Sequence, residues 1–305
     1  MQTADQEDIA GRIFKIQFFC VHDGPGIRTT VFFKGCPLRC LWCHNPEGIQ
    51  RKNHLSFSER KCLCCGACGK VCPDVHRISG GGHTINMDAC KNRGECIDVC
   101  PTKALSMVGQ DVSVGEVLPE LLKEKRYYET SGGGVTISGG EPVLQPEFLL
   151  TLLKAVKKEN IHTAIETCGF CGYEVYETIL PYVDFFLYDF KETNPELHKK
   201  YIGVDNKLIL ENLSKLHRAG ANILLRCPIV HKLNDREDHF KAIAEISKAH
   251  PNLAGAEILP YHKLAASKIE RMGLEAQEEF EQVRKSISDE WPKIIRAYGG
   301  NVIDP

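Results

Sequence analysis

The chain has 305 residues, enough for one large α/β domain or for two domains of average size. Apolar residues make up 43% and charged residues 26%, an ordinary globular balance that excludes wholesale disorder. Thirty-eight basic and forty acidic residues give a net charge of −2, so no broad electrostatic binding of nucleic acid or anionic lipid is expected.

No stretch of the sequence approaches the roughly 18 consecutive apolar residues that a membrane helix needs. The opening residues are polar and acidic, which is not the pattern of a secretory signal. We therefore expect a cytoplasmic protein.

The first predicted elements are two strands, over residues 11–18 and 29–33, which flank a glycine-rich loop at 22–28. Residues 55–108 follow with eight cysteines and little apolar periodicity. This pattern is typical of a small module that folds around something other than a hydrophobic core. From about residue 112 helices and strands alternate.

The alternating part of the chain predicts a parallel sheet. Its predicted helices lie at 114–129, 146–159, 173–180, 206–219, 236–249 and about 275–289, and its strands at 135–138, 163–166, 183–190, 223–230 and 256–260, before a short C-terminal strand. Crossovers of this length join parallel strands with right-handed connections. Polar and glycine-rich residues gather where these strands end, which is where parallel α/β folds build their sites.

Fifteen cysteines are the unusual feature of the composition, and eleven of them lie between Cys36 and Cys100. A reducing cytoplasm would not keep disulfides, and a chain of this size does not need them. Clustered cysteines in such a compartment are typical of metal ligands.

The first group is Cys36, Cys40 and Cys43, with C-x3-C-x2-C spacing. Three thiolates in one tight loop hold three corners of a cubane iron–sulfur cluster and leave one iron open to a substrate. The alternative is a zinc site that borrows a distant fourth ligand.

Two further cysteine runs lie in the module at 55–108. Cys62, Cys65, Cys68 and Cys72, followed by Pro73, have the spacing of a bacterial ferredoxin run. Cys90, Cys96 and Cys100, followed by Pro101, fit the same template, except that Arg93 stands where a cysteine belongs.

Ferredoxin spacing also predicts how the two runs share their ligands, because the fourth cysteine of each run serves the other cluster. One cluster then has Cys62, Cys65, Cys68 and Cys100, and the other has Cys72, Cys90, Cys96 and one further ligand. Cys64, a non-cysteine ligand or a three-iron cluster would each complete the second site. We favour two auxiliary clusters over one.

Two motifs around the first cysteine group resemble a known family. The stretch 23–28 reads DGPG-x-R, and the stretch 33–46 reads FKGCPLRCLWCHNP. Both resemble the glycyl-radical-enzyme activating enzymes (pyruvate formate-lyase activase-like) of the radical S-adenosylmethionine superfamily. Apart from the cysteine-rich insert, the resemblance covers nearly the whole chain, through the segment LPYH at 259–262.

The resemblance implies a fold and a domain organisation. The fold is a partial, open (β/α)6 TIM-like barrel formed by 11–54 and 109–305. A ferredoxin-like [4Fe–4S] domain is inserted at 55–108.

The resemblance also implies an oxidoreductase activity. A reduced [4Fe–4S] cluster on the catalytic cysteines Cys36, Cys40 and Cys43 cleaves S-adenosylmethionine to methionine and a 5′-deoxyadenosyl radical. The radical removes hydrogen from a backbone glycine of a partner glycyl radical enzyme.

Cofactor contacts follow from the same resemblance. Gly139, Gly140 and Glu141 match the family's GGE motif, which accepts from the methionyl ammonium. Taken alone, this segment also fits a plain turn with a solvated glutamate.

The segment Asp189-Phe190-Lys191 matches another family contact to the cofactor. Strand alternation places Asp189 and Lys191 on one face and Phe190 on the other. An acid and a base that face a pocket suit a zwitterionic ligand. The alternative is a surface ion pair that contributes little to stability.

The resemblance also implies contacts to the adenosine part of S-adenosylmethionine and a cation site. By resemblance, Trp42 and His44 line the adenine pocket together with Cys43, and His262 lies near the adenosine; Arg226 is a weaker candidate. Glu166, Thr167 and Asp189 match positions that bind a monovalent cation, although the family commonly has aspartate where Glu166 stands.

The remaining cysteines are Cys20, Cys168, Cys171 and Cys227, which we interpret as small buried apolar residues. Cys168 and Cys171 have C-x-x-C spacing, which leaves a redox or metal role as the alternative.

The expected partners are the glycine loop of a glycyl radical enzyme and a flavodoxin or ferredoxin that donates electrons to a monomeric activase. The insert clusters relay electrons, support the structure or help dock the partner. The rival functions are a radical enzyme acting on a small molecule, a ferredoxin-type electron carrier and a zinc-binding interaction protein.

Overall fold

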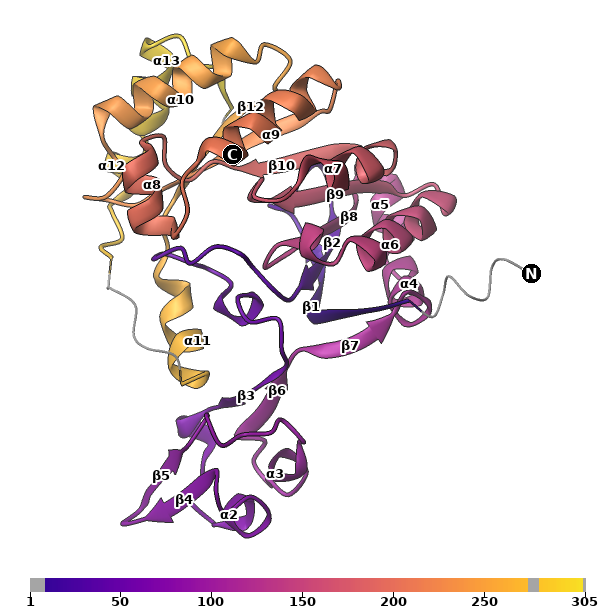
Figure 1. Cartoon of the computed structure of the whole chain (residues 1–305), viewed down its shortest axis with the longest axis vertical. Coiled ribbons are helices and arrows are strands. Elements are labelled where there is room, and N and C mark those ends of the chain that lie inside the picture. The colour runs from indigo at the N-terminus through magenta and orange to yellow at the C-terminus, as the bar shows by residue number, and fades with distance from the viewer. Residues whose placement is uncertain (1–8, 274–279, 304–305) are drawn as a thin grey trace.

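A nine-stranded sheet forms the main body of the protein (Figure 1). The computed structural model describes residues 9–273 and 280–303. The strand order is β13-β12-β11-β10-β9-β8-β2-β1-β7. Among the described residues, no helix is long and apolar enough to cross a membrane.

Seven neighbouring strands of this sheet run parallel, as the alternating pattern predicts. They are β2 (Arg28–Phe33), β8 (Gly134–Gly139), β9 (His162–Thr167), β10 (Phe185–Asp189), β11 (Ile223–Ile229), β12 (Gly255–Pro260) and β13 (Val302–Ile303). β1 (Ala10–Cys20) pairs antiparallel with β2, and β7 (Gln110–Ser113) pairs antiparallel with β1. The parallel strands therefore present their C-terminal ends at one edge.

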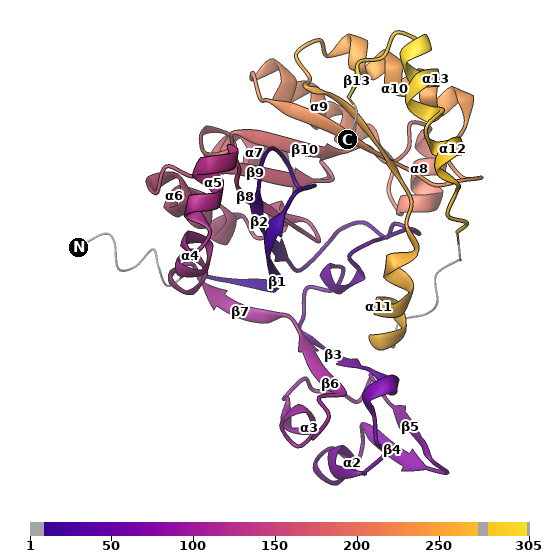
Figure 2. The same ribbon diagram turned by 180° about the vertical axis from the view of Figure 1, so that it is seen from behind.

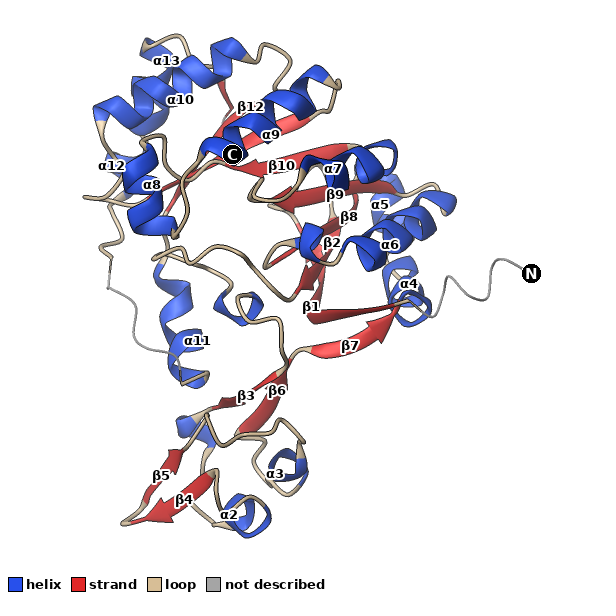
Figure 3. Ribbon diagram, viewed as in Figure 1, coloured by secondary structure: helices blue, strands red, loops and turns tan. Residues whose placement is uncertain are grey.

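Helices connect these strands, and most of them cover one face of the sheet (Figure 3). They are α4 (Val114–Leu122), α5 (Lys125–Ser131), α6 (Pro146–Lys158), α7 (Tyr173–Ile179), α8 (Pro195–Ile202), α9 (Lys207–Arg218), α10 (Glu237–Ala249), α11 (Ala266–Arg271), α12 (Lys285–Ser288) and α13 (Trp291–Ala297). Short 3₁₀ turns lie at η1 (Pro46–Gly48), η2 (Glu59–Lys61), η3 (Pro142–Leu144), η4 (Leu180–Tyr182) and η5 (Lys263–Ala265). Leu149, Leu152 and Val156 form the buried stripe of α6 and pack in one core with Ile137 and Ile165 of the sheet.

Two predicted helices differ from the structure. The helix predicted over 114–129 is two helices, and the first starts with a capping box between Ser113 and Glu116. The helix predicted at about 275–289 is wrong over 280–284, which is not helical, while 274–279 lies outside the described residues. The longer helix there, α13, begins later, with Pro292 in its first turn, where a missing N–H costs nothing.

The cysteine-rich segment projects from one end of the sheet (Figure 2). β3 (His54–Phe57) pairs antiparallel with β6 (Leu105–Val108), and β4 (His76–Ser79) forms a hairpin with β5 (Gly82–Ile85). Two short helices, α2 (Ala67–Val71) and α3 (Glu95–Asp98), contact each other. The apolar cluster here is small and includes Cys68 and Cys96, so thiols take the place that aliphatic side chains hold in an ordinary core.

Candidate functional site

A cavity of about 350 Å³ opens at the C-terminal ends of the parallel strands. The predicted residues that line it are Cys36, Cys40, Trp42, Cys43, His44, Gly139, Gly140, Glu166, Thr167, Asp189 and Lys191. Asp23, Ser138, Cys168 and Arg226 line it as well. Strands far apart in the sequence therefore bring the three cysteines and the acid–base pair to one place.

Backbone hydrogen bonds hold the cysteine loop in the cavity wall. Cys36 N–H donates to the carbonyl of Ile49 at 3.1 Å, and Leu41 N–H donates to the carbonyl of Tyr201 at 3.0 Å. Burial raises the pKa of Cys36 and of Cys40 to about 12, and that of Cys43 to about 11. Cys40 is buried, and Cys36 and Cys43 are partly exposed towards the cavity. Thiols of this kind become thiolates when a cation binds them, and soft thiolate donors suit an iron–sulfur cluster.

Gly139 and Gly140 let the end of β8 lie against the entrance of the cysteine loop. A Cβ at Gly140 would overlap the carbonyl oxygens of Gly35 and Gly48, and Gly139 has φ of +119°. Only glycine tolerates both the contact and that backbone angle. The two glycines therefore position the cysteine loop, in addition to forming part of the cavity wall.

The carboxylate of Glu141 lies behind the cavity wall. It accepts from the backbone N–H of Cys168 at 2.7 Å and from the hydroxyl of Thr167 at 2.8 Å, and the side chain is fully buried. Burial raises the pKa of Glu141, while the bonds from Cys168 and Thr167 oppose that rise. In this arrangement Glu141 ties β8 to the end of β9, so the solvated-turn interpretation is wrong.

Asp189 and Lys191 both line the cavity, whereas Phe190 packs in the hydrophobic core, as strand alternation predicts. Lys191 Nζ lies 2.6 Å from Asp189 Oδ2. Burial lowers the pKa of Lys191, but the neighbouring carboxylate of Asp189 and the thiol of Cys40 more than offset it, so the pKa is raised. The ammonium therefore stays charged at any physiological pH.

The residues predicted to hold a monovalent cation all have protein partners. Glu166 accepts from Arg226 at 2.6 Å and also from the Ser138 hydroxyl. The hydroxyl of Thr167 is bonded to Glu141 and to Tyr176, while Asp189 is bonded to Lys191, as described above. A guanidinium thus supplies the positive charge beside Glu166.

The aromatic side of the cavity is formed by the end of the cysteine loop. His44 stacks on Tyr261, with ring centroids 5.5 Å apart, and its Nε2 donates to the carbonyl of His262 at 3.2 Å. Trp42 is buried, and its Nε1 has no hydrogen-bond partner among the described residues. The ring of His262 is exposed and does not line the cavity, so this segment acts on the site through the contacts of Tyr261 and the His262 carbonyl with His44.

The DGPG-x-R stretch forms a fixed loop at the N-terminal ends of β2 and β8. Arg28 is fully buried and donates to Thr136 Oγ1 at 2.6 Å, to the carbonyl of Val135 at 2.7 Å and to that of Pro25 at 3.0 Å. Asp23 Oδ2 accepts from the hydroxyl of Thr30 at 2.5 Å, and the backbone carbonyl of Asp23 accepts from the hydroxyl of Thr136 at 2.6 Å. These bonds place the Asp23 side chain in the cavity wall.

Two cavities in the described part of the cysteine-rich module are each lined by cysteines of both runs. The first, of about 20 Å³, is lined by Cys62, Cys65, Cys68 and Cys100, with Cys64 and His83 also in its wall. The second, of about 130 Å³, is lined by Cys72, Cys90 and Cys96. The chain thus brings together the thiol sets that crosswise ferredoxin ligation requires.

Oxygen donors lie beside the second set of thiols. Glu95 Oε2 is 3.7 Å from Cys72 Sγ, and Asn92 Oδ1 is 3.4 Å from Cys90 Sγ. Arg93 carries no thiol but also lines this cavity, and Cys64 Sγ donates instead to the carbonyl of Gly81 at 3.2 Å, beside the first cavity.

The four remaining cysteines divide by position. Cys20 and Cys227 are buried, as expected for small apolar residues. Cys168 is also buried but lines the main cavity, whereas Cys171 is half-buried and does not. Cys168 and Cys171 are both free thiols.

Sequence reasoning missed several residues of the site. Ser138 and Asp23 lay within quoted motifs but received no role, although both line the cavity. Lys268 on α11 donates to the carbonyl of His44 at 3.0 Å and pairs with Glu47 at 3.2 Å. No local signal identifies Lys268, because its partners lie more than two hundred positions earlier in the sequence.

The comparisons with known families agree with this arrangement. Residues 98–243 match the model of the radical SAM superfamily, and residues 54–113 match a 4Fe-4S dicluster domain. In fold, the chain is similar to a radical SAM methyltransferase from Sphaerobacter thermophilus, with a TM-score of 0.54 at 13% identity, over 99% of this chain and 74% of that one.

Curated relatives align over most of both chains. The choline trimethylamine-lyase activating enzyme of Oleidesulfovibrio alaskensis is 44% identical over 270 residues, 86% of this chain and 87% of that one. The isethionate sulfite-lyase activating enzyme of the same organism is 39% identical, with 88% and 89% covered. The trans-4-hydroxy-L-proline dehydratase activating enzyme of Clostridioides difficile is 37% identical, with 85% and 87% covered. With this identity over most of its length, the chain belongs to the activating enzymes of glycyl radical enzymes, within the radical SAM superfamily.

Proposed function

We propose that this chain activates a glycyl radical enzyme by removing a hydrogen atom from a backbone glycine, with S-adenosylmethionine cleaved to methionine and 5′-deoxyadenosine. The observation that carries the proposal is the cavity itself. Three free thiols, Cys36, Cys40 and Cys43, line it together with the Asp189–Lys191 pair. When bound and reduced, a [4Fe–4S] cluster on these thiols supplies the electron that cleaves the carbon–sulfur bond.

The chain's own residues bind and orient S-adenosylmethionine. Lys191 provides the cation for the methionyl carboxylate, and the backbone of Gly139 and Gly140 accepts from the ammonium. The adenine lies against Trp42 and His44. Glu141 keeps the glycine segment in place through β9, so we assign it as a positioning residue.

The parallel strands end together around the main cavity, and this arrangement supports the prediction of an open barrel. We assign 11–54 and 109–305 to an open (β/α)6 barrel and 55–108 to a ferredoxin-like insert. Such a barrel has a lateral opening that admits a protein loop, and this requirement matches a substrate that is a glycine within a folded partner.

The insert holds two auxiliary clusters in this proposal. Cys62, Cys65, Cys68 and Cys100 ligate the first, and Cys72, Cys90 and Cys96 contribute to the second. The two clusters relay electrons from a flavodoxin or ferredoxin to the main cavity of a monomeric enzyme.

Cleavage of the cofactor is tested anaerobically. The protein is reconstituted with iron and sulfide, reduced and mixed with S-adenosylmethionine, and 5′-deoxyadenosine is quantified. Cys40→Ala should abolish the product, whereas Cys227→Ala, a buried cysteine outside the cavity, should retain it. Failure of the iron-loaded, reduced wild type to form product, even with candidate partners present, would overturn the proposal and favour an electron carrier.

The partner is tested by electron paramagnetic resonance. Candidate glycyl radical enzymes are incubated with the reduced, iron-loaded protein. The first candidate is a choline trimethylamine-lyase, because the activating enzyme of that lyase is 44% identical to this chain. A glycyl radical signal that needs both proteins and the cofactor is expected. Cleavage of S-adenosylmethionine that modifies an added small molecule, with no protein radical in any partner, would favour the small-molecule alternative.

A further inference from the structure

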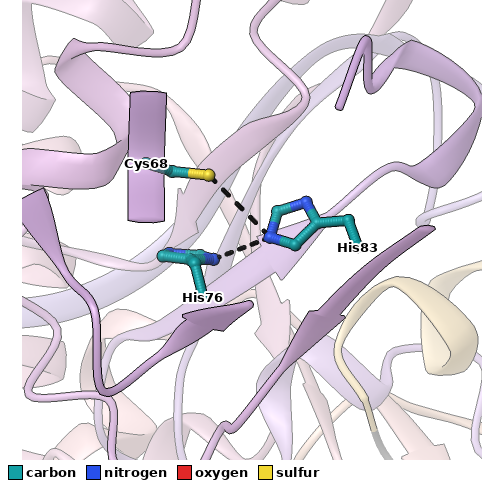
Figure 4. A group of neighbouring side chains, drawn as sticks. All are labelled: Cys68, His76 and His83. Atoms are coloured by element: carbon teal, nitrogen blue, oxygen red, sulfur yellow. Dashed lines mark hydrogen bonds between the residues drawn. The ribbon is translucent and has the colours of Figure 1, made fainter. Parts of the chain in front are cut away.

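The β4–β5 hairpin of the insert brings two histidines to one face. In its register His76 is opposite Ile85, and Ile78 is opposite His83. His76 and His83 are therefore diagonal neighbours, and diagonal side chains on one face of an antiparallel pair lie within reach of each other. Their rings contact each other in Figure 4, with Nδ1 of His76 at 3.0 Å from Nε2 of His83.

His83 also contacts two thiols of the first auxiliary cavity. Its Nδ1 lies 3.4 Å from Cys62 Sγ, and its Nε2 lies 3.8 Å from Cys68 Sγ. The ring packs edge-on against Phe57, with centroids 4.6 Å apart, which fixes its plane. His76 behind it is buried, and its Nε2 has no partner among the described residues.

The protonation pattern of the pair follows from these contacts. A cysteine that ligates a cluster is a thiolate and can only accept a hydrogen bond. Both ligand sulfurs face the ring, but Nδ1 is closer to Cys62 Sγ, at 3.4 Å, than Nε2 is to Cys68 Sγ, at 3.8 Å. We therefore assign the single ring hydrogen to Nδ1, where it faces Cys62, and Nε2 is then the acceptor. Nδ1 of His76 donates to that acceptor, which leaves the partnerless Nε2 of His76 without a hydrogen.

We propose that His83 donates a hydrogen bond to the Cys62 ligand of the first auxiliary cluster and raises its reduction potential, with His76 as the residue that fixes the ring and its tautomer. A donor dipole beside a ligand sulfur stabilises the more negative, reduced cluster. The inference rests on the ligand assignment proposed above. It gives the first auxiliary cluster a potential tuned separately from the second.

A separate mononuclear metal site is the competing interpretation of the same side chains. One donor atom each from Cys68, His76 and His83 lies within 4.8 Å of the others, a spacing that suits a metal ion. Cys68, however, shares its cavity with Cys62, Cys65 and Cys100, which together make a complete four-thiol set. A metal on Cys68 would remove one ligand from that set, so the hydrogen bond from His83 to the Cys62 ligand is the favoured interpretation.

The first test is a redox titration of the reconstituted holoenzyme, followed by electron paramagnetic resonance. His83→Phe keeps an aromatic ring against Phe57 but removes the donor, and it should shift one cluster to a more negative potential. We expect the reduced-to-oxidised ratio at fixed potential to fall about tenfold. For a one-electron couple this corresponds to a shift of about 59 mV. His83→Gln retains an N–H and should shift the potential less.

The matched control is Thr84→Val, because Thr84 follows His83 on the same strand but is exposed and bonds only to a backbone carbonyl. It should leave every potential unchanged. Iron and sulfide content, measured on each sample, separates a failed ligand assignment from a failed hydrogen bond. Unchanged potentials in a His83→Phe protein of full iron content would overturn the proposal.

The second test uses wild-type protein and does not depend on any variant folding. Pulsed resonance on protein labelled with ¹⁵N-histidine should show a weak nitrogen coupling to one reduced cluster, as a hydrogen bond to sulfur produces. A strong coupling would mean direct ligation by His83, and bound zinc with one cluster missing would mean the mononuclear site. Either result, or no coupling at all, contradicts the proposal.

Discussion

Arg226 on β11 donates to Glu166 on β9 at 2.6 Å, across the end of the intervening strand β10, and it also pairs with Glu257 on β12 at 3.1 Å. Burial raises the pKa of Glu166, and the guanidinium of Arg226 opposes that rise. Glutamate is one methylene longer than the aspartate that the resemblance leads us to expect at this position. That extra length brings the carboxylate to the guanidinium.

The Arg226–Glu166 pair leads to a prediction about monovalent cations. In the wild type, replacing potassium by tetramethylammonium should change S-adenosylmethionine binding and cleavage by less than about twofold, because the guanidinium already balances Glu166. Glu166→Asp shortens the side chain, breaks the contact and should make binding depend on potassium by about tenfold, or 1.4 kcal/mol. Binding is measured calorimetrically in both salts. Strong potassium dependence of the wild type would show that the guanidinium does not replace the cation.

Gly140→Ala should uncouple the cysteine loop from β8. The added Cβ overlaps the carbonyls of Gly35 and Gly48, so the loop has to shift and its thiols lose their common centre. We expect loss of the iron bound at the main cavity and a fall in deoxyadenosine formation of about a hundredfold. Gly82→Ala in the insert hairpin, where the nearest atom would lie at 3.7 Å, is the control and should keep full activity. Normal activity of Gly140→Ala would mean that the loop tolerates the shift.

Arg28→Met should destabilise the loop that precedes β2. The substitution leaves the carbonyls of Pro25 and Val135 and the hydroxyl of Thr136 without their buried donor. The expected loss in the free energy of unfolding is about 3 kcal/mol, since each unsatisfied buried polar group costs about 1–3 kcal/mol. Urea unfolding followed by circular dichroism measures it, with the exposed Arg77→Met as the control. A loss equal to that of the control would contradict this account.

His239 should make the folded state sensitive to mild acid. Burial lowers its pKa to about 4, while Glu192 and Asp238 raise it and Arg236 lowers it further. Its Nδ1 accepts from the backbone N–H of Thr193 at 3.2 Å, which requires the unprotonated atom. The unfolded chain binds a proton near pH 6.5, so stability falls as pH drops from about 6.5 towards 4, by about 1.4 kcal/mol per unit.

The pH dependence is checked by unfolding wild type and His239→Asn at pH 7.5 and at pH 5.5. The asparagine keeps an acceptor for the Thr193 N–H but does not titrate. The wild type should lose about 1 kcal/mol more than the variant over this range. Equal losses of unfolding free energy in both proteins would show that groups other than His239 cause the loss of stability in acid.

Much of the fold was predictable because its signals are local. Alternation along Asp189, Phe190 and Lys191 placed the acid and the base on the cavity side and the ring in the core, as the structure has them. Helix α6 lies within one residue of its predicted range because its apolar stripe is continuous. The helix predicted at about 275–289 was wrong over 280–284, whereas α12 lies within its range, and the longer helix there begins only at Trp291.

By itself, the sequence determined the chemistry of the donors: which cysteines are grouped, that the strands are parallel, and that polar residues follow their ends. Spacing and periodicity involve only a few neighbouring residues, so they can be recognised from the sequence alone. Only the tertiary structure decided that Glu141 faces β9, that Arg226 takes the charge of Glu166, and that His83 lies beside Cys62. Each of these contacts joins different elements, and a contact of this kind exists only after sheet order and hairpin register have set which side chains meet.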